Sequence, residues 1–213
     1  AGVVISRYFG AGDIKEVQRA IHTTICFGLI AGLTLTVLGS ILAPEILKLM
    51  GTPESVFPNA VLYVRIYFGG ILTIVMYNTA SGIFQAVGDS KRPLYFLIIS
   101  SITNVVLDLL FVVVFNMGIG GAAIATVIAQ AVSAFLAFRH LICTKDVYKV
   151  SLKKVALHID MLKQILKMGI PSGIQNSVIA LANIVVQSNI NSFDAVAVAG
   201  CGAYSKIEGF VFI

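Results

Sequence analysis

The most constraining feature of this sequence is a series of long, unbroken apolar runs. Five are complete, at about residues 20–43, 60–86, 93–115, 120–142 and 168–191. Each has the roughly 20 residues that a helix needs to cross the hydrocarbon core of a bilayer. Residues 1–9 look like the tail of an earlier span, and 195–213 are expected to begin a sixth. The chain is therefore expected to be an integral membrane protein.

The same runs decide the fold class. A membrane-spanning strand alternates apolar and polar residues, whereas these runs are continuous. We therefore predict an all-α fold, a polytopic transmembrane helical bundle. Hydrophobic residues make up 58% of the chain and charged residues only 12%, with a mean hydropathy of +0.95. The sequence has no phosphate-binding loop, zinc-hydrolase helix or nucleophile elbow, so we expect neither an enzyme nor a resident cofactor.

Basic residues give the expected orientation. Of the 15 Lys and Arg residues, 12 fall in alternate connections between the runs, and the intervening connections hold only Lys48. The basic side is expected to be cytoplasmic by the positive-inside rule. Because the basic residues lie between apolar runs, the net charge of +5 gives no reason to expect nucleic-acid binding.

The most basic connection is expected to divide the chain into an N-terminal lobe (1–142), a cytoplasmic linker (143–167) and the start of a C-terminal lobe (168–213). Within it, Lys145 to Lys167 is predicted to form an amphipathic helix on the membrane surface. Two related turns, 9–13 and 85–89, precede other spans on the same side. In each, a glycine is expected to end one helix and the following aspartate, Asp13 or Asp89, to cap the next.

Asp108 is the one carboxylate within the five complete runs. Asn104 lies one helical turn before it, and Ser100 or Ser101 one turn earlier. Such a polar face is not expected to point at lipid, because a carboxylate at mid-bilayer costs about 2.5–3.5 kcal/mol on insertion scales. We favour a protonatable or sodium-binding site, and the alternative is a polar clamp between helices.

A second polar face lies in run 168–191 and carries no charge. Its residues recur at steps of four or seven, so they share one side of a helix: Ser172, Asn176, Asn183, Gln187 and Asn191. We predict that this stripe lines a water-filled cavity. Tyr67, Tyr77 and Asn78 are expected to contribute to the same cavity. Gly28 with Gly32, and the small residues between Ala125 and Ala137, are expected to serve helix packing.

Several short segments occur together in a recognisable order. They are Gly10-Ala11-Gly12-Asp13, Gln85-Ala86-Val87-Gly88-Asp89, Asn104-Val105-Val106-Leu107-Asp108 and the stretch from Gly118 to Thr126. In this order they resemble the multidrug and toxic compound extrusion family over essentially the whole chain. The resemblance implies that the chain runs from the second to the eighth helix of a two-lobe, twelve-helix transporter.

That resemblance also implies a function. Members are antiporters that export small organic, often cationic, compounds in exchange for Na⁺ or H⁺. Asn104, Asp108 and Thr126 match the family's cation site, so Na⁺ is a possible ligand of Asp108 and Asn104. We expect a multi-pass monomer surrounded by lipid, in the cytoplasmic (inner) membrane of a bacterium.

Three alternatives remain open from the sequence. A flippase for lipid-linked saccharides would be expected to have more basic residues inside its spans than Arg65 and Lys206. An ion channel would fit a polar helix but requires a pore, for which no pattern argues. A structural scaffold would tolerate neutralisation of Asp108.

Overall fold

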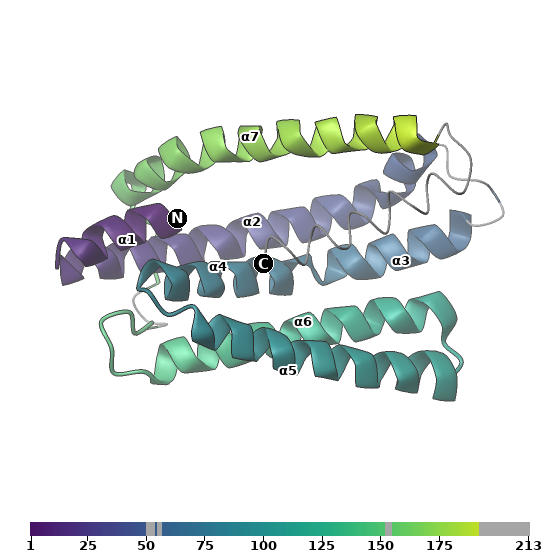
Figure 1. Ribbon diagram of the computed structural model, residues 1–213, viewed down its shortest axis with the longest axis horizontal. Helices are drawn as coiled ribbons and strands as arrows, with labels where there is room; N and C mark the ends of the chain where they lie inside the picture. The colour runs from purple at the N-terminus through teal and green to yellow at the C-terminus, as the bar shows by residue number, and fades with distance from the viewer. Residues whose placement is uncertain (50–53, 55–56, 152–154, 192–213) are drawn as a thin grey trace. The chain divides into compact units, whose positions relative to one another are not determined.

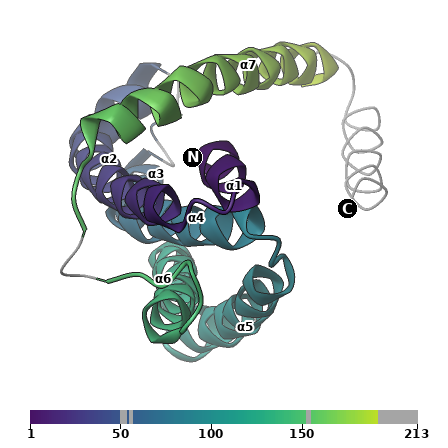
Figure 2. The same ribbon diagram turned by 90° about the vertical axis from the view of Figure 1, so that its left-hand side faces the viewer.

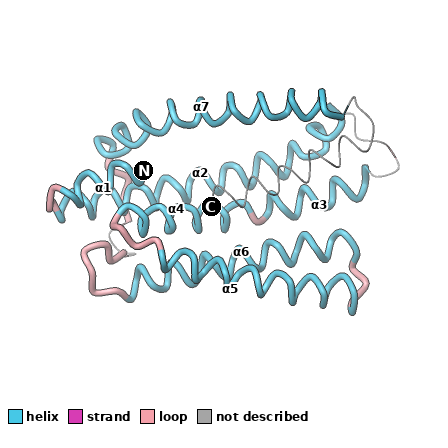
Figure 3. Tube along the Cα trace, viewed as in Figure 1, coloured by secondary structure: helices cyan, strands magenta, loops and turns pink. Residues whose placement is uncertain are grey.

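The computed structural model describes residues 1–49, 54, 57–151 and 155–191, and within these ranges it contains helices and no strands (Figures 1 and 3). The elements in order are α1 (Gly2–Gly10), α2 (Ile14–Leu49), α3 (Phe57–Gly69), α4 (Ile71–Ala86), α5 (Lys91–Asp108), the π-helix η1 (Leu109–Val114), α6 (Gly118–Cys143) and α7 (Ile159–Asn191). Contacts within the chain group it into two compact units, Ala1–Ile165 and Leu166–Ile213. The all-α prediction is confirmed for the described residues, and the expected span at 195–213 lies outside them.

Four of the predicted spans correspond to helices that are long and apolar enough to cross a membrane. Three are single spans, at Ile14–Lys48, Lys91–Val114 and Gly118–Cys143, and α3 with α4 forms a fourth, bent by 42° where the helices meet at Gly70. The fifth predicted run is helical throughout as part of α7. The side chains near its C-terminal end lie outside the described part of the structure, so that it spans a membrane stays a prediction.

Small residues set the packing in the first unit. Helix α2 packs against α3 and α4, and α6 packs against α3, α4 and α5 (Figure 2). A Cβ built on Gly28 would lie 2.8 Å from Thr79 Oγ1, and one built on Gly32 would lie 3.3 Å from the Cα of Leu72, so both glycines let α2 approach α4 closely. On α6, the four residues that recur every fourth position are all buried: Ala125, Ala129, Ser133 and Ala137. The predicted packing roles are confirmed.

The two related turns have the predicted geometry. Gly12 and Gly88 adopt φ values of +72° and +85°, in the left-handed region that ends a helix. Asp13 then accepts a hydrogen bond from the backbone N–H of Glu16, and Asp89 accepts one from that of Arg92, each at 3.2 Å. Each aspartate therefore supplies a partner for a backbone donor at the start of α2 or α5.

The connection between α6 and α7 differs from the prediction. In the described residues between Thr144 and His158 there is no helix, and α7 begins only at Ile159. We call residues 144–158 the connector. Tyr148 and Val150 are buried in the core at this end of the bundle, and the N–H of Val150 donates to the carbonyl of Leu141 at 2.8 Å. The N–H of Lys149 also donates to the carbonyl of Asp146 at 3.0 Å, so this part of the connector contains a turn and is not a helix lying on a surface.

The packing of small residues in the first unit can be tested at the bend between α3 and α4. Gly70 is buried, and a Cβ there would lie 2.5 Å from Cγ2 and 3.1 Å from Cβ of Val127 on α6. Because Val is stiff at χ1, Gly70→Ala should cost about 1–3 kcal/mol. The melting temperature of the detergent-solubilised protein should fall by several degrees. Gly82→Ala is the matched control, since a Cβ there meets nothing within 4 Å; equal melting temperatures for the two variants would refute the packing.

Candidate functional site

The polar face predicted on α5 is present. Ser100 is 3% exposed, and its hydroxyl donates to the carbonyl of Ala129 on α6 at 2.6 Å. One and two turns later, Asn104 Nδ2 and Asp108 Oδ1 are buried atoms without a hydrogen-bond partner among the described residues. An unmet buried polar group costs about 1–3 kcal/mol, and more if it is charged. The two atoms therefore mark a place where a further ligand or a proton would be stabilising.

The contact between Ser100 and Ala129 fixes the register of α5 on α6. The helices run in opposite directions side by side (Figures 1 and 2), and each residue advances about 1.5 Å along its axis. Asn104 therefore lies level with Ala125 and Thr126. Thr126 is partly buried, and its hydroxyl donates to the carbonyl of Ala122 at 3.0 Å. The fold thus places the three residues implied by the family resemblance on adjoining helices.

A π-helix begins directly after Asp108. Within η1, the N–H of Phe115 donates to the carbonyl of Leu110, five residues back, at 2.9 Å. A Cβ on Gly121 would lie 3.0 Å from that of Phe111, so the backbone of α6 closely approaches η1. The sequence predicted a single helix over 93–115 and missed this change. Single π turns occur frequently at functional sites, where they displace the side chains that flank them.

The chemistry of this face suits a hard cation or a proton. A carboxylate and an amide oxygen are ligands that hard cations prefer, and a lone carboxylate can also carry a proton. Among the described residues, no group of three or more His, Cys, Asp or Glu side chains could hold a metal ion. A transition-metal centre therefore has no support in this part of the chain.

The three cavity residues predicted in run 60–86 have different environments. Tyr67 is 38% exposed and stacks on Tyr63, with ring centroids 6.4 Å apart. Asn78 is exposed, and its amide donates to the carbonyl of Ile74 at 3.0 Å. Tyr77 belongs to the hydrophobic core, and its hydroxyl donates to the carbonyl of Pro93 at 2.9 Å. Tyr77 thus ties α4 to α5, and its contribution to a cavity stays a prediction.

The polar stripe lies on α7 as expected from its spacing. Ser172, Asn176 and Asn183 are all exposed, and the hydroxyl of Ser172 donates to the carbonyl of Met168 at 3.1 Å. The helix includes Gln187 and Asn191, but their side chains lie outside the described part of the structure. That the stripe lines a cavity stays a prediction.

Comparison with known proteins identifies the family that has this architecture. The model of the MatE family matches residues 1–110, just over half of the chain. The chain belongs to the MatE family. It is therefore part of a multi-pass integral membrane protein, as the resemblance to multidrug and toxic compound extrusion proteins implied.

Individual relatives agree with this assignment. The chain is 34% identical over 210 residues to the probable multidrug resistance protein YpnP of Bacillus subtilis, covering 98% of this chain and 46% of the relative. It is 30% identical to YoeA of the same organism, covering 99% and 47%. A crystal structure described as MATE in the bent conformation superposes with a TM-score of 0.85 at 27% identity, covering 97% and 46%. The chain thus spans about half the length of these proteins.

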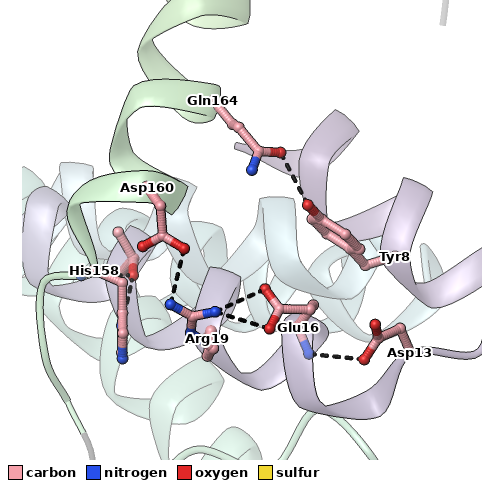
Figure 4. A network of polar contacts seen from close by, with 8 residues as sticks. Tyr8, Asp13, Glu16, Arg19, His158, Asp160 and Gln164 are labelled. Atoms are coloured by element: carbon pink, nitrogen blue, oxygen red, sulfur yellow. Dashed lines mark hydrogen bonds and ion pairs between the residues drawn. The ribbon is translucent and has the colours of Figure 1, made fainter.

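This MatE protein also has a polar attachment that the sequence analysis missed. Two successive turns of α2 each present two polar residues to the connector and to the first turn of α7: Gln18 and Arg19, then His22 and Thr23. Gln18 Nε2 donates to the carbonyls of Val147 and Lys149, the latter at 3.2 Å. Figure 4 shows Arg19, held by Glu16, reaching Asp160 at 2.8 Å, and Tyr8 of α1 donating to Gln164 at 3.0 Å. The sequence feature that could have predicted these contacts is the i, i+4 spacing of polar residues at the start of an apolar run.

A second attachment joins the connector to α5. Arg92, held by Asp89 at 2.9 Å, donates to the hydroxyl of Tyr148, which in turn donates to Asp146 at 2.7 Å. Thr144 donates to the same carboxylate oxygen at 2.7 Å. The hydroxyls of Thr144 and Tyr148 lower the pKa of Asp146 by stabilising its charged form, and burial raises the pKa of Tyr148. The arginine after the first of the two related turns therefore holds the start of α7, and the arginine after the second holds the connector.

The lowered pKa of Asp146 has a consequence for stability. A carboxyl whose pKa is lower in the folded state stabilises above its unfolded value, about 3.9, and this contribution is lost as pH falls through the folded pKa. Melting temperatures of the solubilised MatE protein should therefore fall less on acidification below about pH 4 in Asp146→Asn than in the wild type. Thr144→Val, which removes one of two donors, should be intermediate. Parallel melting curves for all three proteins would contradict the assignment.

Proposed function

We propose that the full-length protein is a cation-coupled antiporter that exports small organic, often cationic, compounds across the bacterial cytoplasmic membrane. The observation that carries this proposal is the buried, unpartnered Oδ1 of Asp108, one helical turn after Asn104, in a chain of the MatE family. Two relatives from Bacillus subtilis are named probable multidrug resistance proteins, which supports the substrate class.

The coupling ion, Na⁺ or H⁺, would bind at Asp108. Its carboxylate supplies the charge that a cation or proton neutralises, and Asn104 supplies an amide one turn away. Thr126 offers a hydroxyl from α6 at the level of Asn104. Because the ion replaces partners that the described protein groups do not provide, its binding would stabilise the arrangement of α5 against α6.

The exported compound would bind the polar stripe of α7, with Asn176, Asn183 and Gln187 as hydrogen-bonding groups. Ion and substrate then use different residues, so their coupling is a free energy between sites. Such couplings are typically about 1–3 kcal/mol and are reciprocal: if the ion weakens substrate binding by some factor, the substrate weakens ion binding equally. A saccharide flippase is less well supported, since Arg65 is the one basic residue well inside the described apolar runs.

Equilibrium titration of a fluorescent organic cation into the full-length protein, at several pH and sodium values, tests this arrangement. Asp108→Asn should retain binding but lose its dependence on pH or sodium, and it should abolish ion-driven efflux from vesicles. Asn183→Leu is the comparison variant: it should weaken substrate binding while keeping the ion dependence.

Two results would contradict the proposal. Normal ion-driven efflux by a folded Asp108→Asn protein would remove Asp108 from the coupling site. Loss of substrate binding by Asp108→Asn under every condition would mean that ion and substrate share ligands.

A further inference from the structure

His22 holds the connector through an imidazole that is neutral in the observed arrangement. The side chain is 2% exposed, with Nδ1 2.7 Å from the carbonyl of Gln18 and Nε2 3.2 Å from the backbone N of Ser151. A carbonyl only accepts, so Nδ1 carries the proton and donates. The N–H of Ser151 only donates, so Nε2 is an unprotonated acceptor. Both ring nitrogens are therefore committed to one tautomer.

His158, at the other end of the connector, is held by Thr23 in a related way. The backbone N–H of His158 donates to Thr23 Oγ1 at 3.2 Å, and the same oxygen lies 3.2 Å from Nδ1 of the His158 ring. Thr23 is fully buried, and among the described contacts the acceptor for its hydroxyl proton is this Nδ1. With this hydroxyl as the donor, the ring of His158 accepts at Nδ1 and is neutral.

Both histidines have access to water. They line a cavity of about 700 Å³ between α2 and the connector, together with Ile14, Lys15, Gln18, Arg19 and Ala156. The charged groups around it are Lys15 and Arg19 on its wall, with Glu16 and Asp160 bound to Arg19. The carboxylates balance Arg19, which leaves the Lys15 ammonium as the net charge beside the imidazoles.

We infer that these contacts form a proton-sensitive clasp, which holds the connector on α2 while His22 and His158 are neutral and releases it when they are protonated. A proton on Nε2 of His22 would point an N–H at the N–H of Ser151, replacing a hydrogen bond with a repulsive contact. A proton on Nδ1 of His158 would likewise remove the acceptor of the Thr23 hydroxyl. The inference rests on these contacts alone and does not require the proposed function.

Release is expected on acidification, because an added proton converts an accepting ring nitrogen into a donor. The contact of Arg92 with Tyr148 and the buried side chains of Tyr148 and Val150 would remain, since they involve neither histidine. Acidification should therefore detach the part of the connector near Ser151 and His158 rather than unfold the bundle.

Distances between two spin labels on the full-length protein test the clasp. The labels are placed at Ser6 on α1 and Leu157 in the connector, both exposed, in a background without cysteine. Pulsed electron resonance should give a single narrow distance at pH 8 and a broader, longer distribution at pH 5. The double variant His22→Gln/His158→Gln cannot gain this charge, and its glutamine oxygens can accept the same donors, so its distribution should not change with pH.

A pair of neighbouring threonines provides the matched control. Thr23→Val removes the hydroxyl that binds His158 and should broaden the distribution already at pH 8. Thr24 is equally buried, but its hydroxyl donates to the carbonyl of Ala20 within α2, so Thr24→Val should behave as the wild type. The clasp is overturned if the wild-type distribution is the same at pH 8 and pH 5, or if the double glutamine variant keeps the full pH response.

Discussion

A carboxylate within the hydrocarbon core of a membrane is stable only where protein groups, a bound cation or a proton replace the water that it loses. Asp108 is the one residue of this kind within the complete apolar runs, and it accounts for much of the surrounding structure. Helix α5 turns its polar face to α6, Ser100 binds the carbonyl of Ala129, and the helical geometry widens to a π-helix immediately after Asp108. Yet Asp108 Oδ1 and Asn104 Nδ2 remain without partners among the described residues. A bound cation or a proton would stabilise a carboxylate left in this state.

At the membrane boundary polar side chains are not costly, because water is available there. In this protein they join the connector and the start of α7 to the helices of the first unit. The arginines that follow the two related turns hold Asp160 at the start of α7 and Tyr148 in the connector. Gln18 binds carbonyls of the connector, which are not paired within a helix. The connector is therefore part of the first compact unit, which extends to Ile165. Its fastening through two neutral histidines gives this region a chemical sensitivity that the apolar spans lack.

The sequence was sufficient to predict the structure of those segments in which one physical effect dominates. Apolar length predicted α2, α5 and α6, and the need for a positive φ predicted the turns at Gly12 and Gly88. It failed where several weak effects compete. The helix predicted over 145–167 begins only at Ile159, because side-chain hydrogen bonds and burial of Tyr148 and Val150 hold the preceding chain in an irregular path. The hydrogen bond from Tyr77 to the carbonyl of Pro93, which joins α4 to α5, was likewise not predicted. Neither contact can be read from local spacing.

The central claim is that Asp108 is a carboxyl group that changes its state when the coupling ion binds. Infrared difference spectroscopy of the full-length protein, with isotope-labelled aspartate, measures this directly. Acidification should produce the carbonyl stretch of a protonated aspartic acid that is absent from Asp108→Asn, and sodium should suppress this band if Na⁺ is the coupling ion. If the wild type and Asp108→Asn give identical difference spectra across pH and sodium concentration, Asp108 does not exchange ions and the account is wrong.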